Sequence, residues 1–259
     1  MHKHERKKII LDVVNEKRFI ETRNLLLLLE SKGINESTAR RDLKELESEN
    51  KVLLSFGSVT SKIYDQFEKT RVEKTRENKA EKEIIGHKAA ELLEKDEVIF
   101  CSGGTSIENF VKLIDKRVRL LITNSFPVFL QAWKNENIAD VYLLGGFFRE
   151  KTQVFFSNNI KKWIEGKKFS KAFFSCVSVD EAGNLYDDFE PESTLMQEVM
   201  TKTKQLVLLA DSSKFLSYGV NLMCNMSQVD YLVTDDKTKD IIKDLNWDVK
   251  VIFGGTNEQ

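Results

Sequence analysis

A run of small and hydroxylated residues, Ser102-Gly103-Gly104-Thr105-Ser106, directly follows an apolar stretch of the chain. Two adjacent glycines let a backbone approach an anion closely. The free N–H groups at the start of a helix, together with nearby hydroxyls, can then hold a phosphate. A plain glycine-rich turn between a strand and a helix is the alternative interpretation. The surrounding segments must decide between these two.

Four further polar segments follow apolar stretches later in the chain. In an open parallel sheet, ligands bind beyond the carboxyl ends of the strands, so such segments gather at one edge. Together they would supply amides, an arginine fork for phosphate and a carboxylate–lysine pair, which suits a phosphorylated sugar or polyol. Their candidate binding residues are Asn124, Ser125, Gly145, Arg149, Asp180, Glu192, Asp211 and Lys214.

The histidines and cysteines do not indicate a metal site. His2, His4 and His87 lie outside the polar segments, and no spacing of His, Cys and carboxylate residues is typical of metal ligands. The three cysteines are far apart in apolar runs, which favours reduced, buried thiols in a cytoplasmic protein. No apolar run approaches the length of a membrane span. We therefore expect no metal, no cofactor and no membrane segment.

A second group of candidate residues lies on a predicted helix at 35–49. Asn35 can cap its first turn, and Ala39, Leu43 and Leu46 form one apolar stripe. Arginine can fork onto guanine or phosphate, and serine and threonine can bond to either, so the other face suits a DNA major groove. For an isolated helix, a solvated charged face is the simpler interpretation. The candidate DNA-binding residues are Ser37, Thr38, Arg40, Arg41 and Lys44.

The elements around this helix favour DNA binding. A helix is predicted at 4–17, a second helix around 25–29, a turn at 32–35 and two short strands at 51–55 and 58–63. Three helices and a hairpin are the outline of a winged helix-turn-helix. Lys+Arg 40 against Asp+Glu 41 gives a net charge of −1, so affinity for DNA would need local placement of charge. It would also need at least two copies, as a homodimer or homotetramer.

The rest of the chain alternates between strands and helices. Continuous aliphatic runs separated by helices predict an α/β domain with a mainly parallel sheet. The expected organisation is a DNA-binding domain at 1–60, a charged linker at 61–80 and an effector-binding domain at 81–259. Strands are predicted at 97–101, 118–123, 141–144, 171–177, 206–210, 231–234 and 249–253, and helices at 106–114, 127–134, 158–165, 192–203 and 237–245.

These motifs, in this order, resemble the DeoR family of bacterial transcriptional regulators. The most specific run is Thr-x-Arg-Arg-Asp-Leu in the predicted recognition helix. The matching segments are 37–43, 99–106, 123–125, 144–146 with Arg149, and 209–215. The resemblance implies a winged-helix domain joined to a sensor domain similar to ribose-5-phosphate isomerase.

Family sensors bind phosphorylated sugars or polyols and usually release DNA when they do. By resemblance, Gly104, Thr105 and Ser106 would hold the phosphate, and Asn124, Gly145, Arg149, Asp211 and Lys214 would complete the pocket. The chain departs from the family pattern at Ser102, where aspartate is usual, and at 54–58, where the wing is neutral and lacks the usual His-Gly-Gly.

The leading hypothesis is a cytoplasmic repressor of a carbohydrate-utilisation operon. It would bind a double-stranded DNA operator and be released by a phosphorylated sugar or polyol. The alternative is a sugar-phosphate isomerase with a regulatory N-terminal domain. In that enzyme Asp180, Asp211 or Glu192 would act as base and Lys214 would stabilise charge. A DNA-bound scaffold without a ligand is a third possibility.

Overall fold

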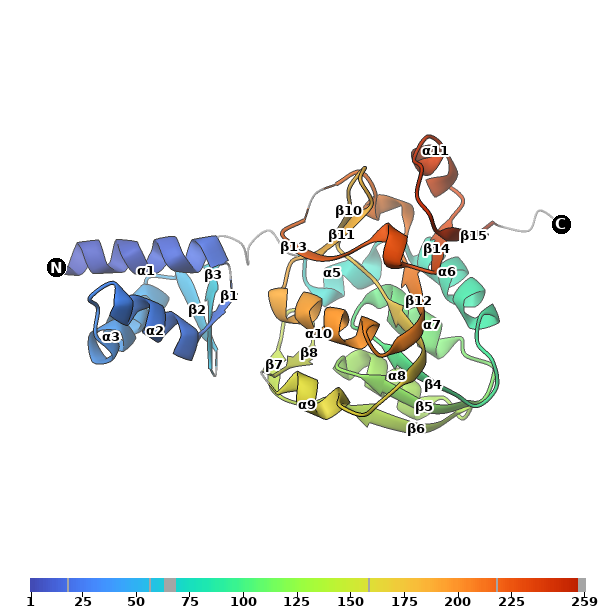
Figure 1. The fold of residues 1–259 in the computed structure, drawn as a ribbon, viewed down its shortest axis with the longest axis horizontal. Helices are drawn as coiled ribbons and strands as arrows, with labels where there is room; N and C mark the ends of the chain where they lie inside the picture. The colour runs from blue at the N-terminus through green and yellow to red at the C-terminus, as the bar shows by residue number, and fades with distance from the viewer. Residues whose placement is uncertain (18, 56, 63–68, 158, 218, 256–259) are drawn as a thin grey trace. The chain divides into compact units, whose positions relative to one another are not determined.

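The computed structural model describes residues 1–17, 19–55, 57–62, 69–157, 159–217 and 219–255 (Figure 1). The chain divides into two compact units, Met1–Lys69 and Thr70–Gln259. The predicted linker at 61–80 contains a short helix, α5 (Arg71–Arg76), and the first residues of α6 (Lys79–Glu91). Residues 63–68 of that linker, the last residue of the strand predicted at 58–63, and position 56 of the predicted wing lie outside the described residues.

The first unit is the predicted winged helix-turn-helix. Its three-stranded antiparallel sheet has the order β1-β3-β2. Side chains from all three helices and from the sheet form one core, in which Ile10, Leu25 and Leu46 are fully buried. Strand β1 was not predicted, because three residues are too few to show an alternating pattern. The elements are α1 (Lys3–Lys17), β1 (Phe19–Glu21), α2 (Thr22–Ser31), α3 (Glu36–Ser48), β2 (Val52–Ser55) and β3 (Ser58–Ser61).

The second unit is built on a seven-stranded sheet with the order β15-β14-β12-β9-β4-β5-β6. Every neighbouring pair is parallel, which confirms the predicted α/β class. The strands are β4 (Glu97–Cys101), β5 (Val118–Thr123), β6 (Ile138–Leu143), β9 (Phe169–Phe174), β12 (Thr203–Leu209), β14 (Tyr231–Asp235) and β15 (Lys250–Gly254).

Helices cover both faces of this sheet, as Figure 1 shows. On one face α6, α7 (Thr105–Lys112) and α8 (Phe126–Lys134) pack through residues such as Phe110. The other face holds α9 (Ile160–Ile164), α10 (Glu190–Met200) and α11 (Thr238–Ile242), with Leu195 and Val199 in the core. Burial on both faces explains the apolar runs in the central strands, such as Val-Ile-Phe-Cys in β4 and Leu-Val-Leu-Leu in β12.

Two small antiparallel sheets were not predicted. One has the order β10-β11-β13 and packs over the face covered by α10, and the other is the hairpin β7-β8. Both contribute to the polar edge of the unit. Their bounds are β7 (Phe147–Arg149), β8 (Val154–Phe156), β10 (Ser178–Val179), β11 (Asn184–Asp187) and β13 (Asn221–Asn225).

Candidate functional sites

Helix α3 presents the predicted polar face. The Asn35 side chain accepts a hydrogen bond from the Thr38 N–H at 2.9 Å, which confirms the predicted N-cap. Ser37, Arg40, Arg41 and Lys44 are exposed and Thr38 is half-buried, whereas Ala39, Leu43 and Leu46 face the core. The five predicted DNA-binding residues therefore share the outer side of one capped helix.

The cations on this face differ in their partners. Arg40 pairs with Glu36 one turn earlier, at 2.8 Å between Nη2 and Oε1. The side chains of Arg41 and Lys44 make no ion pair or hydrogen bond with any described residue. An exposed i,i+4 pair is weak, so a phosphate can displace Glu36 from Arg40 at little cost. Arg41 and Lys44 need no such exchange.

Asp42 has a structural role that the sequence reading missed. Its side chain is 0% exposed and binds the Arg6 guanidinium of α1 at 2.8 Å (Nε to Oδ2) and 3.3 Å (Nη2 to Oδ1). The signal was present in the sequence, because Asp42 falls on the same helical stripe as Ala39 and Leu46. A carboxylate on an apolar stripe requires a cation partner.

Surface ion pairs extend this contact between α1 and α3. Lys3 and Lys7 both bind Glu45, at 2.7 and 2.8 Å, and Lys7 also binds Glu49 at 2.6 Å. The hydrogen bonds from Lys3 and Lys7 lower the pKa of Glu45 to about 2. Those from Lys51 and Lys7 lower the pKa of Glu49 to about 2. One side of α3 is thus held by α1 while the other side stays open.

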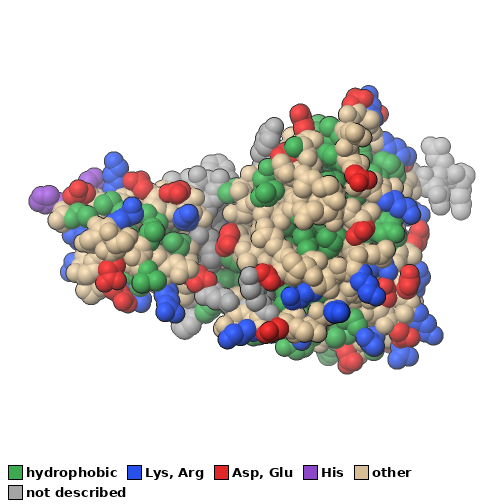
Figure 2. Space-filling model, in the orientation of Figure 1, with side chains coloured by type: hydrophobic (Ala, Val, Ile, Leu, Met, Phe, Trp, Pro, Cys, Tyr) green, Lys and Arg blue, Asp and Glu red, His purple; other side chains and the backbone are tan. Residues whose placement is uncertain are grey.

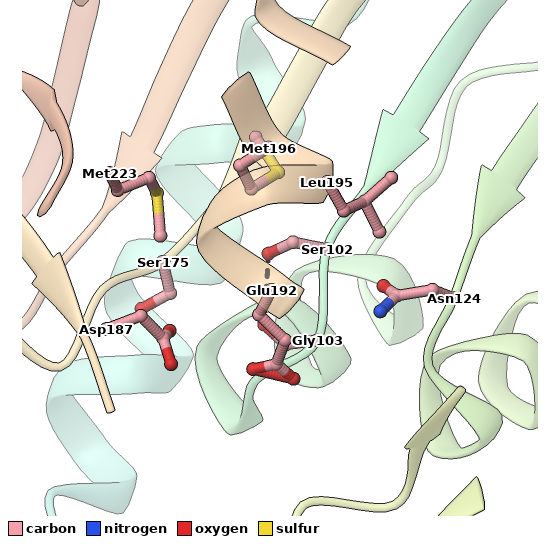
Figure 3. Close-up of a pocket in the computed structure, with 9 residues that line it drawn as sticks. All are labelled: Ser102, Gly103, Asn124, Ser175, Asp187, Glu192, Leu195, Met196 and Met223. Carbon is pink, nitrogen blue, oxygen red and sulfur yellow. Dashed lines mark hydrogen bonds between the residues drawn. The ribbon is translucent and has the colours of Figure 1, made fainter. Parts of the chain in front are cut away.

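A pocket lies at the carboxyl ends of β4, β5 and β9, with about 270 Å³ of space that includes open solvent. Figure 3 shows the Asp187 and Glu192 carboxylates and the Asn124 amide pointing toward it, with Met196 and Met223 along another side. Its lining residues are Ser102, Gly103, Asn124, Ser175, Asp187, Glu192, Leu195, Met196 and Met223.

Four of the predicted effector-binding residues line this pocket, namely Ser102, Gly103, Asn124 and Glu192. Asn124 is 2% exposed, and its Nδ2 donates to the Phe155 carbonyl at 3.2 Å. Its Oδ1 is also buried and accepts no hydrogen bond from any described residue. A buried acceptor without a donor is costly, so a ligand hydroxyl at this point would be favourable.

The predicted phosphate loop begins α7 beside the pocket. Gly104 has φ +128°, a conformation that glycine adopts readily, and Thr105 and Ser106 are buried in the first turn. A Cβ on Gly103 would lie 2.8 Å from Val154 Cγ1 of β8, so that glycine is required for close packing of the hairpin. Ser125 caps α8 by accepting from the Val128 N–H.

The other predicted pocket residues are placed outside this lining. Gly145 lies beside the Trp163 ring, and the Arg149 guanidinium lies 4.3 Å from the centre of the Phe189 ring. Asp211 and Lys214 follow the end of β12. Asp211 caps the 3-10 turn η1 (Ser212–Lys214), and Lys214 is the last residue of that turn. The Asp211 carboxylate is fully buried. The segments thus gather at one sheet edge, but only part of the set converges on one cavity.

Asp180 belongs to the turn between β10 and β11. Its carboxylate accepts hydrogen bonds from the Asn184 N–H, the Asn184 side chain and the Tyr186 hydroxyl, at 2.8 to 3.0 Å. Burial alone would raise the pKa of Asp180, but these hydrogen bonds outweigh it and lower the pKa. The Asp180 carboxylate is therefore ionised and held in place by the turn.

Sequence reasoning missed five lining residues: Ser175, Asp187, Leu195, Met196 and Met223. Asp187 and Met223 come from the unpredicted strands β11 and β13, and Leu195 and Met196 come from α10. The apolar residues looked like ordinary core positions. Because β11 was not predicted, no local signal marked Asp187 as a residue of this lining.

The cysteines are buried, and the metal-binding side chains of the described residues are dispersed. Cys101, Cys176 and Cys224 are buried free thiols, as predicted, and burial raises the pKa of Cys176 and Cys224 to about 12. Within the described ranges, no three His, Cys, Asp or Glu side chains gather as a metal ion would require. None of the helices in those ranges is long and apolar enough to cross a bilayer.

Comparison with known proteins decides the family. Residues 77–236 match the model of the DeoR C-terminal sensor domain, and residues 6–62 match that of the DeoR-like helix-turn-helix domain. The chain belongs to the DeoR family. The two matched ranges correspond to the two units, and α5 lies between them.

Relatives within this family are similar along nearly the whole chain. A lactose phosphotransferase system repressor of Streptococcus mutans serotype c is 31% identical over 97% of this chain and 100% of its own length. The protein of that name from Staphylococcus aureus strain MRSA252 is 28% identical over the same shares.

Solved structures resemble only part of the chain. Ribose 5-phosphate isomerase A of Methanocaldococcus jannaschii gives a TM-score of 0.40 at 18% identity, covering 53% of this chain and 55% of that one. The Pyrococcus horikoshii translation initiation factor eIF-2B gives 0.42 at 13% identity, covering 61% and 63%. At TM-scores below 0.5, neither likeness carries an argument about this DeoR-family chain.

Proposed function

We propose that this protein is a transcriptional repressor of a carbohydrate-utilisation operon. In this proposal α3 binds an operator in double-stranded DNA, and a phosphorylated sugar or polyol in the pocket of the second unit releases it. The observation that carries the proposal is the polar face of α3. The side chains of Arg41 and Lys44 on this face are exposed and without partners among the described residues. On the opposite side of α3, Asp42 binds Arg6 of α1.

The pocket supports the effector part of the proposal. Asn124 Oδ1 is a buried acceptor that a sugar hydroxyl can satisfy, and the Asp187 and Glu192 carboxylates face the same space. The Gly104–Thr105 start of α7 offers backbone N–H groups at a helix N-terminus, where a phosphate is stabilised. The relatives named as lactose phosphotransferase system repressors favour a sugar-derived effector.

The charge of the chain argues for more than one copy on DNA. The net charge is −1, and on the face shown in Figure 2 basic and acidic side chains are interspersed over both units. A single α3 offers few phosphate contacts, and two copies on paired half-sites double them. We propose a homodimer or homotetramer that acts in the cytoplasm. Light scattering of the full chain tests this, and a monomer that binds DNA tightly would contradict it.

The role of α3 is tested with Arg41→Ala in the full-length protein. Affinity for a fragment of its own promoter should fall at least about tenfold, and the log–log salt slope should fall by about one per copy. The matched control is Arg119→Ala, an exposed arginine on β5 of the second unit. The control should bind like the unmodified protein. Unchanged binding by Arg41→Ala would remove α3 from its assigned role.

We also propose that the protein does not isomerise sugar phosphates. Of the three carboxylates that could act as base, Asp180 is committed to a turn and Asp211 lies outside the pocket lining, so Glu192 is the one candidate left in the lining. Incubation with pentose and hexose phosphates tests this, since turnover would establish an enzyme. A sugar phosphate that binds should raise the melting temperature of the protein, because ligands stabilise the state that they bind. No thermal shift with any of them would favour the scaffold hypothesis.

A further inference from the structure

Helix α5 is the first element of the second unit and begins two residues after Lys69. A reciprocal capping box closes its start: the Thr70 hydroxyl accepts from the Glu73 N–H at 3.3 Å, and the Glu73 carboxylate accepts from the Thr70 N–H at 2.7 Å. A six-residue helix is not stable alone in water, so its position is set by the groups that it touches.

The first of these groups belongs to α7. The Arg71 guanidinium binds both carboxylate oxygens of Glu108, with 2.8 Å between Nε and Oε1 and a second bond between Nη2 and Oε2. The two side chains are 26% and 10% exposed, so the pair is only partly screened by solvent. Glu108 lies one turn after Gly104, where the candidate phosphate loop enters α7. The pair therefore ties α5 to the helix that carries this loop.

The second group is the β7-β8 hairpin. The Arg71 N–H donates to the carbonyl of Lys151, in the turn of the hairpin, at 3.0 Å. On its other side the hairpin holds a pocket residue: the Phe155 N–H donates to the Asn124 carbonyl at 2.8 Å, and the Asn124 side chain donates back to the Phe155 carbonyl. Thus Arg71 is joined to Asn124 through one hairpin.

The end of α5 is fixed as well. The Lys82 ammonium is 4% exposed and donates to the carbonyls of Lys74 and Glu77, at 2.6 and 2.8 Å. Asn78 follows in a left-handed conformation, and its side chain donates to the buried carboxylate of Asp211 at 2.9 Å. Both ends of this short helix are therefore held by the sheet edge that carries the polar segments.

We propose that α5 transmits occupancy of the effector pocket to the DNA-binding unit, with Arg71 as its receiving residue. The Arg71–Glu108 pair connects it to the phosphate loop, and the β7-β8 hairpin connects it to Asn124. This inference rests on the proposed function and specifies its regulation. Neither family model covers α5, so neither assigns it a role.

The physical basis is that both connections respond to a ligand. A phosphate at the start of α7 would lie about one helical turn from the Glu108 carboxylate and repel it. This repulsion would shift the Glu108 side chain and the Arg71 guanidinium bound to it. A ligand hydroxyl that donates to Asn124 Oδ1 would add a second partner to the amide that holds the hairpin and so restrain both. Both changes act on Arg71, which lies two residues after Lys69, the last residue of the first unit.

The test compares four full-length proteins: the unmodified chain, the double variant Arg71→Met/Glu108→Leu, the single variant Arg71→Lys, and the matched control Lys88→Met/Glu91→Leu. Removing both members of a pair leaves no buried charge without a partner. The control removes an i,i+3 ion pair on α6 in the same unit. Affinity for the promoter fragment is measured with and without ribose 5-phosphate, glucose 6-phosphate, fructose 6-phosphate and galactose 6-phosphate. Thermal shifts with the same compounds report binding separately.

For a compound that releases the unmodified protein, we expect a loss of DNA affinity between about 5-fold and 150-fold, and the same loss in the control. The double variant should show the same thermal shift but a release at least about fivefold smaller. Arg71→Lys, which keeps the charge without the fork, should show an intermediate release. Full release by the double variant would overturn this inference and leave the proposed function standing. Loss of the thermal shift in the double variant would also overturn it, because the Arg71–Glu108 pair would then act in effector binding. If the unmodified protein responds to none of the compounds, the proposed effector response itself fails.

Discussion

Replacing Arg6 by methionine would test what holds α3 in place. The Asp42 carboxylate is fully buried and takes both of its short contacts from the Arg6 guanidinium. In the Arg6→Met protein this carboxylate stays in the interior without a cation. Breaking a buried pair by removing one partner costs about 3 kcal/mol or more, because the remaining charge is uncompensated.

That loss is large for a unit of this size. Met1–Lys69 spans 69 residues, and domains of such length are stable by roughly 3 to 10 kcal/mol. Each kcal/mol shifts the melting temperature of a small domain by about 4 to 8 °C, so the first unit should melt about 12 °C or more below its normal temperature. The second unit, which does not contain the pair, should melt as before.

The assay is differential scanning calorimetry of the full chain, with hydrogen exchange of the α3 amides to identify the transition of the first unit. Arg6→Met/Asp42→Leu should recover most of the loss, because leucine has the branching of aspartate and an apolar pair replaces the ionic one. Arg40→Met, which breaks the exposed pair with Glu36, should cost less than about 0.5 kcal/mol. If Arg6→Met costs less than about 1 kcal/mol, or if the double variant is no more stable than the single one, burial of this pair does not fix α3.

Two further predictions concern the two units separately. Hydrogen bonds lower the pKa values of Glu45 and Glu49 from 4.5 to about 2 in the folded state. The stability that these two carboxylates give the first unit is therefore complete above pH 4.5 and is lost as the pH falls toward 2. Calorimetry should show the first unit losing stability across that window. The loss should be less steep in the Glu45→Gln/Glu49→Gln variant. In the second unit, Gly166→Ala should cost about 1 kcal/mol, since φ is +70° but a Cβ has nothing within 4 Å. Gly146→Ala should cost about 2 kcal/mol more, because its Cβ would lie 2.2 Å from the Phe156 carbonyl oxygen; equal melting temperatures for the two variants would contradict this reasoning.

Helix α3 was predictable because everything that defines it is local. The capping side chain, the apolar stripe and the polar face all fall within fifteen consecutive positions, and α3 begins and ends within one residue of the predicted range 35–49. Most strands of the parallel sheet were predictable for a similar reason, since they contain short apolar runs. The edge strand β6 (Ile138–Leu143) is partly exposed, and the prediction at 141–144 missed its first three residues. The exception on α3 is Asp42, whose partner Arg6 lies 36 residues earlier, beyond any helical period.

The small antiparallel sheets were not predictable in the same way. Strand β10 has two residues and β11 has four, and β11 pairs with β13 more than thirty residues later. That pairing depends on the packing of α10 between them in the sequence, which no local pattern encodes. Asp187 and Met223 reach the pocket only because these strands meet, so their place in the lining had no local signal.

The two sides of the pocket differ in whether a local sequence pattern predicts them. One side of it, at Ser102 and Gly103, adjoins the loop that begins α7, and this loop supplies backbone N–H groups that suit any phosphate. The other side is made by α10, β11 and β13, whose side chains would contact the rest of a phosphorylated ligand. Because backbone groups are the same for every sequence, discrimination among sugar phosphates must come from that second side. Under the proposed function, the choice of effector would therefore be set by this second side, where Glu192 is the one lining residue that the sequence predicted.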